Sequence, residues 1–282
     1  MIDLQADFFY YDFYDDDEMD GDDRELDLIL NNLEKYKSLD SANLCNRNLK
    51  MLPPRILNAL QLKYLYLNGN KLIYEPDIGN LTQLEELCME NNQLSLIPDT
   101  YGSLKQLKCL SLSNNSIKCL NTSLMTSLNQ LNILWLNSCE LLYLPKEIGH
   151  LVHLEKIGLR SNCLVDLPDE FGRLTRLKWI CLKDNRLERL PDSFGNLKSL
   201  GYLNLSANSF KQIPTVLASL SDSLVILELE SNQIKSLSDD ELLTYSNLRH
   251  LNLIGNPFVD QIQKTNKKFY DELMKLKNFH FI

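Results

Sequence analysis

Catalysis needs a nucleophile, a proton carrier or a set of metal ligands at a recognisable spacing, and this sequence offers few of them. Its four histidines are His150, His153, His250 and His280, and no cysteine or carboxylate pattern beside them completes a zinc site. Seven cysteines are scattered singly, without a C-x-x-C pair, and neither a phosphate-binding glycine loop nor a G-x-S-x-G motif occurs. We therefore expect no enzyme activity, no cofactor and no metal.

One weak metal pattern lies near the N-terminus. Asp16, Glu18, Asp20 and Gly21, with Asp27 at the twelfth position, resemble a calcium-binding loop. Asp23, however, occupies the place where an apolar residue normally packs. A solvated acidic segment is the reading that we prefer.

Binding chemistry has stronger candidates, because aromatic rings and cations recur at alternate positions of short apolar segments. Tryptophan, tyrosine and arginine are the residues that dominate protein interfaces. The candidate partner-binding residues are Tyr64, Tyr66, Trp135, Lys156, Arg160, Trp179, Lys183 and Tyr202. The packing alternative is that the rings only contact one another across neighbouring strands.

A repeat positions these residues. It can be aligned on Leu39, Leu62, Leu84, Leu107, Leu131, Leu154, Leu177, Leu200, Leu224 and Leu248, which are 22 to 24 residues apart. Each block follows L-x-x-L-x-L-x-x-N-x-L-x-x-L-P-x-x-[IF]-G-x-L with variations, and residues 177–197 are the clearest copy. Ten copies cover residues 39–258, so the body of the chain is one repetitive structure.

Each copy predicts a short strand followed by a turn. The L-x-L alternation indicates leucines that point inward and intervening residues that point outward. The asparagine nine residues into a copy can satisfy backbone groups where the chain leaves the strand. Arg47 and Cys139 replace it in two copies. A proline then favours an irregular or helical segment on the opposite, convex side.

This pattern resembles the leucine-rich repeat family, and the L-P-x-x-[IF]-G-x-L stretch resembles its intracellular Ras-group type. The resemblance implies an α/β solenoid: a leucine-rich repeat horseshoe of about ten 22–24-residue repeats, with a parallel concave sheet and helical caps. It also implies a scaffold that binds small GTPases and associated signalling proteins.

The remaining segments predict two caps and a tail. Residues 1–21 form an acidic-aromatic, disordered tail, and residues 22–38 an N-terminal capping helix with Leu26, Ile29, Leu30 and Leu33 on one face. Residues 39–258 are the repeats. Residues 259–282 are the C-terminal cap, with an amphipathic helix over 259–277 and one last strand near Phe279.

Charge and compartment limit the partners. The net charge is -9, but ten of the 38 acidic residues lie in residues 1–23, so the rest of the chain has 28 acids against 29 basic residues. A nearly neutral body excludes nucleic-acid binding. The cysteines are odd in number and scattered, which indicates a reducing, cytoplasmic compartment. No 18-residue apolar run occurs, and no basic stretch precedes the first apolar residues, so we expect neither a membrane span nor a signal peptide.

We therefore expect a non-catalytic, intracellular protein-binding scaffold in signal transduction. Its concave face would bind a globular partner, and the resemblance implies a Ras-like GTPase or a phosphatase complex. A phosphatase-regulatory or cytoskeletal leucine-rich repeat subunit is the alternative. The tail can also fold back onto a basic group and compete with the partner, or it can remain free in solvent. This group consists of Lys156, Arg160, Lys178 and Lys183.

Overall fold

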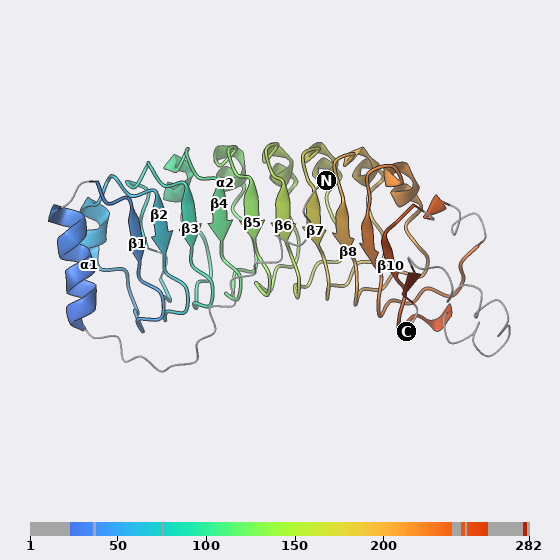
Figure 1. Ribbon diagram of the computed structural model, residues 1–282, viewed down its shortest axis with the longest axis horizontal. Helices are drawn as coiled ribbons and strands as arrows, with labels where there is room; N and C mark the ends of the chain where they lie inside the picture. Colours follow the sequence, from blue (N-terminus) through green and yellow to red (C-terminus); the bar gives the residue numbers. More distant parts are fainter. Residues whose placement is uncertain are drawn as a thin grey trace.

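The structure is a computed structural model that describes residues 23–35, 38–74, 76–238, 244–245, 247–258 and 279–280. Eleven parallel strands form one open sheet in which each strand lies beside the next strand of the chain (Figure 1). The strands are β1 Ser41–Asn43, β2 Tyr64–Tyr66, β3 Glu86–Cys88, β4 Cys109–Ser111, β5 Ile133–Trp135, β6 Lys156–Gly158, β7 Trp179–Cys181, β8 Tyr202–Asn204, β9 Ile226–Glu228, β10 His250–Asn252 and β11 Phe279–His280. The predicted solenoid with its parallel concave sheet is confirmed.

The strand register is the same from copy to copy. Leu65 of β2 is in register with Leu87 of β3, and Leu87 with Leu110 of β4. These central side chains are fully buried, and the residues on either side of them lie on the opposite face of the sheet, where Tyr66 and Glu86 are half-buried. Since the side-chain period of a strand is two, this register places every outward residue of the repeats on one continuous surface.

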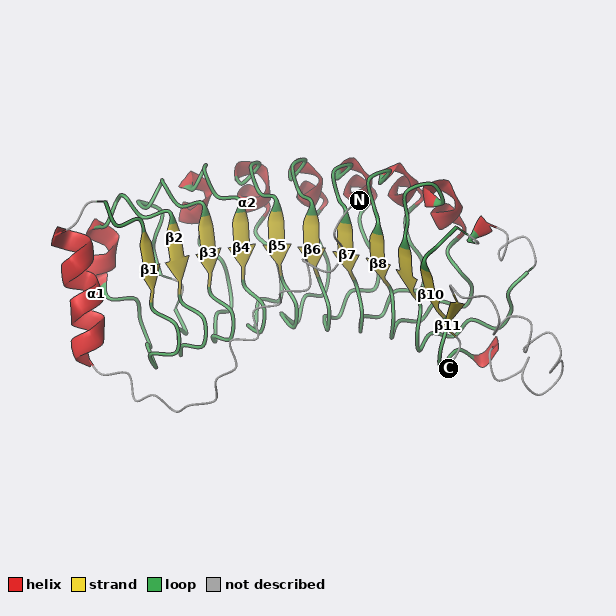
Figure 2. Ribbon diagram, in the orientation of Figure 1, coloured by secondary structure: helices red, strands yellow, loops and turns green. Residues whose placement is uncertain are grey.

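Short helices run along the other side of the arc (Figure 2). They are the 3-10 helices η2 Pro54–Asn58, η3 Asp99–Ser103, η4 Lys146–His150, η5 Asp169–Arg173, η6 Asp192–Asn196 and η7 Thr215–Leu220, and the α-helix α2 Thr122–Ser127. A proline immediately precedes or opens each 3-10 helix, as expected from its fixed φ. The copy with α2 lacks this proline, and Asn121 caps the helix by accepting a hydrogen bond from the Ser123 amide.

The repeated asparagines form a buried ladder, as the sequence predicted. The Asn162 amide donates to the carbonyl oxygens of Leu136 and Leu159 at 2.8 and 2.9 Å. Its own oxygen accepts from the backbone amides of Cys139 and Leu141. Each asparagine thus joins its own strand end to the preceding copy, which satisfies backbone groups that would otherwise be buried without partners.

Cys139 takes over part of this role in its copy. Its thiol donates to the Leu112 carbonyl oxygen at 3.3 Å, where an asparagine would place its amide. Burial is the main cause that raises the pKa of the Cys139 thiol to about 12. The thiol therefore stays protonated and remains a donor.

A feature that the sequence analysis missed lies one position before the asparagine. There the backbone is left-handed in all ten copies, with φ between 53° and 71°. Gly69 and Gly255 adopt this conformation at little cost, but Ala207 and other non-glycine residues adopt it too. The tight turn out of the strand is therefore imposed by the neighbouring copies, even where the residue disfavours it.

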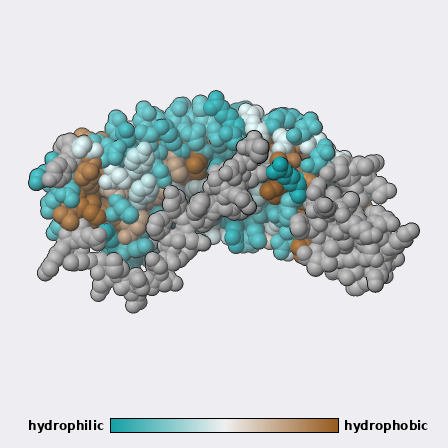
Figure 3. Space-filling view, viewed as in Figure 1, coloured by the Kyte–Doolittle hydropathy of each residue, from teal (hydrophilic) through white to brown (hydrophobic). Residues whose placement is uncertain are grey.

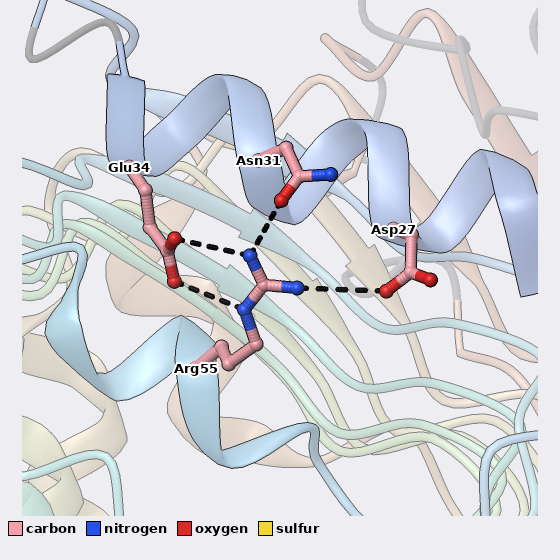
Figure 4. Close-up of polar contacts among 4 residues, drawn as sticks. All are labelled: Asp27, Asn31, Glu34 and Arg55. Carbon is pink, nitrogen blue, oxygen red and sulfur yellow. Dashed lines mark hydrogen bonds and ion pairs between the residues drawn. The ribbon is translucent and has the colours of Figure 1, made fainter.

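The helix α1, Asp23–Lys35, covers the β1 end of the solenoid. Leu30 and Leu33 are buried against the core, and Arg55 from η2 reaches back to Glu34, Asn31 and Asp27 (Figure 4). At the other end β11 pairs with β10, through Leu251 and Phe279. The predicted tail (1–21), the calcium pattern before Asp23 and the predicted helix at 259–277 lie outside the described residues.

Candidate functional site

Three aromatic side chains form a cluster on the concave face. The rings of Trp135 and Trp179 meet edge to face, with centroids 5.2 Å apart and an interplanar angle of 78°. Trp179 also stacks on Tyr202 at 5.2 Å, with the rings 4° from parallel. All three side chains are half-buried. The rings therefore do pack against one another across neighbouring strands, as the packing alternative predicts, and they still present ring surface to solvent.

Gly158 makes this cluster geometrically feasible. It lies on β6, between the strands that carry the two tryptophans, and is in register with Trp135. A Cβ atom at Gly158 would be 2.5 Å from Cε3 of Trp135 and 2.8 Å from Oδ1 of Asn137. The Trp135 side chain therefore lies over a position that only glycine leaves open, and from there its ring reaches Trp179.

Cations border the rings. Lys156 is in register with Trp179, while Arg160 and Lys183 follow β6 and β7 by two residues. Within the described part of the chain, neither Arg160 nor Lys183 forms an ion pair. Lys178 was expected to join this basic group, but it binds Glu155 at 2.7 Å, so its charge is largely neutralised.

Acidic side chains lie on both sides of this basic centre. Glu86 and Glu90 belong to the β3 copy, and Glu228 and Glu230 to the β9 copy. Glu228 contacts His250 at 2.9 Å. The concave face is therefore acidic, then basic and aromatic, then acidic along its length, a pattern that favours a partner with the complementary order of charges.

The structure separates the eight candidate residues into two groups. Tyr64 and Tyr66 lie on β2, three strands before Trp135, or about 14 Å at the usual strand spacing. Burial and the carboxylate of Glu86 raise the pKa of Tyr66, so this pair belongs to the acidic flank. The other six are brought together on β5–β8, and we call them the central concave surface: Trp135, Lys156, Arg160, Trp179, Lys183 and Tyr202.

Sequence reasoning missed a second surface, at the twelfth and thirteenth positions of the copies. In five of the first six copies at least one of these positions holds a large apolar side chain with an exposed fraction of 47 to 76%, whereas copy four holds Lys118 and Cys119. We call them the edge stripe: Met51, Ile73, Tyr74, Leu96, Leu142, Tyr143 and Val165. In copies seven to nine the same positions hold Glu188, Arg189, Lys211, Gln212, Lys235 and Ser236.

The alignment contained the signal for this stripe. Both positions lie between the leucine that follows the asparagine and the leucine that precedes the proline, where a loop residue is expected to be polar. Figure 3 shows a largely hydrophilic face with separate hydrophobic patches, one of them at the α1 end. Exposed apolar side chains at these positions in five of the first six copies are therefore a departure from that expectation.

Metal and membrane features were also sought in the structure. Among the residues that the structure describes, no three His, Cys, Asp or Glu side chains gather closely enough to hold a metal ion. In the same part of the chain, no helix has both the length and the apolar character that a membrane crossing requires.

Comparisons with known proteins agree with the repeat. The chain is 37% identical over 98 residues to a human protein called leucine-rich repeats and immunoglobulin-like domains protein 3, a match to 34% of this chain and 9% of that protein. It is 32% identical over 156 residues to a probable serine/threonine-protein kinase, pats1, of Dictyostelium discoideum, a match to 49% of this chain and 5% of the kinase. The chain thus spans less than a tenth of either curated relative.

A solved structure extends the similarity over most of the fold. A leucine-rich repeat protein of Leptospira interrogans superimposes with a TM-score of 0.77 at 32% sequence identity, covering 88% of this chain and 61% of the other. A model described as a leucine-rich repeat region matches residues 116–282, more than half of the chain. With the solenoid, the asparagine ladder and these matches in agreement, the chain belongs to the leucine-rich repeat family.

Proposed function

We propose that this protein is a non-catalytic scaffold of cytoplasmic signal transduction that binds a globular partner on the central concave surface. The aromatic cluster of Trp135, Trp179 and Tyr202, bordered by Arg160 and Lys183, carries the proposal. Leucine-rich repeat solenoids are protein-interaction modules, and their concave surfaces are extended binding faces.

The physical argument rests on rigidity. Each ring stands on a strand that is hydrogen-bonded to both neighbours, and each is held by another ring, so little conformational entropy remains to be lost on binding. Half-buried aromatic residues beside cations match the composition of interface hot spots. The acidic flanks would then orient the partner and reject ones with the wrong charge order.

The resemblance to the Ras-group type supports a Ras-like GTPase as the partner, or a phosphatase complex associated with one. The phosphatase-regulatory or cytoskeletal subunit is the competing proposal. Families of that kind more often keep 22-residue repeats, whereas one spacing among nine is 22 residues here. The repeat length therefore favours the scaffold.

A binding assay with purified partners tests this function. Titration calorimetry would measure the affinity of the full chain for Ras-like GTPases loaded with GDP or a GTP analogue, and for a phosphatase catalytic subunit. Trp179→Ala is expected to weaken binding by about 2 kcal/mol, or about 30-fold, because it removes the central ring. Tyr143→Ala, an exposed tyrosine of the edge stripe, is the matched control and should leave the affinity unchanged.

The structure also indicates a cost to folding. Trp179 contacts two rings, so Trp179→Ala should lower the free energy of unfolding by about 1–2 kcal/mol. Binding is therefore compared at a temperature where both proteins are fully folded by circular dichroism. Equal loss of affinity in Tyr143→Ala would contradict the proposed site, and binding to the phosphatase subunit alone would favour the competing function.

A further inference from the structure

Two cations on the concave face lie over the same strand. Arg160 and Lys183 occupy equivalent positions of neighbouring copies, two residues after β6 and β7. Burial raises the pKa of the Cys181 thiol, and the nearby charges of Arg160 and Lys183 oppose this rise. Cys181 lies on the concave side of β7, two residues after Trp179. Both charges are therefore close to the strand that carries the central ring.

This arrangement favours an anionic ligand that also carries aromatic rings. Within the described part of the chain, neither Arg160 nor Lys183 has a carboxylate partner. Two neighbouring cations repel each other, and a carboxylate beside them would be attracted to both. The half-buried rings of the central concave surface offer further aromatic residues a surface on which to stack.

The chain itself contains a segment of this composition before α1. Residues 1–21 contain no lysine or arginine. Their eight acidic residues are Asp3, Asp7, Asp12, Asp15, Asp16, Asp17, Glu18 and Asp20, and their six rings are Phe8, Phe9, Tyr10, Tyr11, Phe13 and Tyr14. We propose that this segment binds the central concave surface of its own molecule through residues 7–12 and competes there with the partner. The competition, although not the contact itself, rests on the proposed function of this surface.

The length of chain before α1 selects residues 7–12 for the contact. From β1 to β6 is five strand spacings, about 24 Å, and α1 adds about one helix diameter, or 10 Å. Asp12 and Asp7 lie 11 and 16 residues before Asp23, so an extended chain carries them about 36 and 53 Å. Residues 15–20 extend to about 27 Å at most and fall short of Arg160.

The width of the surface agrees with the same six residues. Residues 7–12 span about 17 Å when extended, and β5 to β8 covers three strand spacings, about 14 Å. Their sequence, Asp-Phe-Phe-Tyr-Tyr-Asp, places a carboxylate on each side of four rings. The segment therefore matches the central concave surface in length, charge and aromatic content.

The first two copies offer a path for the acids that remain. Lys50 and Lys71 are exposed on the edge after β1 and β2, and within the described residues neither forms an ion pair. The carboxylates of residues 15–20 are attracted to this edge, whereas Glu86 and Glu90 would repel them from the concave side of β3. The acidic flank therefore does not block the contact.

A weak contact is sufficient, because the segment and the surface belong to one chain. Exposed ion pairs are individually weak and are screened by salt. A tethered segment, however, has an effective concentration on the order of 1 mM at its site. A segment with a dissociation constant of about 1 mM would thus occupy the surface about half of the time and lower the partner's affinity about twofold.

Tryptophan fluorescence tests the contact without any partner. Trp135 and Trp179 are the two tryptophans of the chain, and both lie in the central concave surface. Quenching by acrylamide, which is uncharged, is compared between the full natural chain and the full-length variant Asp7→Asn/Asp12→Asn. We expect the variant to be quenched up to about twofold more strongly at low salt, and equally in about 1 M NaCl.

A second double variant is the matched control. Asp166→Asn/Asp222→Asn removes the same number of charges at exposed positions outside the concave face, and its quenching should equal that of the natural chain. Equal quenching of all three proteins at low salt would overturn the proposal. A difference that grows with protein concentration would place the contact between molecules and overturn the intramolecular one.

A charge swap tests the residues assigned to the contact. Arg160→Glu/Lys183→Glu should raise the quenching as far as Asp7→Asn/Asp12→Asn does, and adding Asp7→Lys/Asp12→Lys to it should restore the protection. A fourfold variant that stays as strongly quenched would overturn the assignment. Circular dichroism melts confirm that each variant is folded.

Partner affinity is a separate measurement that distinguishes the two proposals. Asp7→Asn/Asp12→Asn should bind the partner about twofold more tightly than the natural chain at low salt. If the partner binds but the quenching does not respond to the variant, the segment contact alone is wrong. If the quenching responds but none of the proposed partners binds, the proposed function alone is wrong.

Discussion

The central concave surface and the edge stripe are built from the same repeat but expose different chemistry. On the concave face, the rings of Trp135, Trp179 and Tyr202 support one another and stand among cations. On the edge, aliphatic and tyrosine side chains are exposed by 47 to 76% and cations lie only between and beyond them. The first surface suits a charged, selective partner, and the second suits a mainly apolar contact.

The contrast teaches that position within the repeat decides what a substitution can do. Inward leucines and the asparagine are fixed by burial, and the asparagine is replaced only by Cys139 and, in the first copy, by Arg47. Outward strand positions and the edge positions carry no such constraint. Two separate surfaces can therefore diverge on one scaffold without altering the solenoid.

The substitution with the largest expected effect, Asn162→Ala, should destabilise the solenoid and thereby both surfaces. Asn162→Ala removes the partner of the Cys139 and Leu141 amides and of the Leu136 and Leu159 carbonyl oxygens. We expect a loss of about 3 kcal/mol in the free energy of unfolding, measured by urea denaturation. Asn196→Ala, at an exposed asparagine of η6, is the control and should change stability by less than about 0.5 kcal/mol. Equal melts for the two variants would contradict a structural ladder.

A smaller change should break the concave surface alone. Gly158→Ala places a methyl group where the Trp135 ring lies, so the ring must move away from Trp179. We expect a loss of about 1–2 kcal/mol in stability and a change in the near-ultraviolet circular dichroism of the two tryptophans.

Gly201→Ala is the matched control for this substitution. A Cβ atom there would have its nearest neighbour at 3.8 Å, an ordinary contact. Its spectrum and stability should equal those of the natural protein. If Gly158→Ala also behaves like the natural protein, the Trp135 ring does not depend on the glycine and the described cluster is wrong.

The substitution with the smallest expected effect on stability, Ala207→Gly, should leave both surfaces intact. Ala207→Gly relieves a left-handed residue with φ of 53°, and we expect a gain of about 0.5–1 kcal/mol after the entropic cost of glycine. Ala218→Gly, at an exposed position of η7, should instead lose about 0.5 kcal/mol. The opposite signs, measured in parallel thermal melts, sharpen the comparison because neither variant should alter partner binding. A loss of stability in Ala207→Gly would show that the left-handed turn carries no strain.

Most of the fold followed from the sequence. The leucine period placed the strands of all ten copies. The buried hydrogen bonds of Asn162, the 3-10 helix after Pro168 and the buried Leu33 of the capping helix were also expected. The left-handed turn before the asparagine escaped notice, because Ala207 and Ser231 carry no local preference for it. The candidate site was predicted as outward residues in the order of their copies, with the basic residues of copies six and seven close together but without the contacts between the rings.

The sequence by itself determined which side chains face inward and which face out, because burial follows the period of the leucines. Tertiary structure alone decided which outward residues meet. It separated Tyr64 and Tyr66 from Trp135, paired Lys178 with Glu155, and let the Trp135 ring cross Gly158 to reach Trp179. The physical reason is that such contacts join residues some 23 to 44 positions apart in the chain, and only the stacking of whole copies sets their distance.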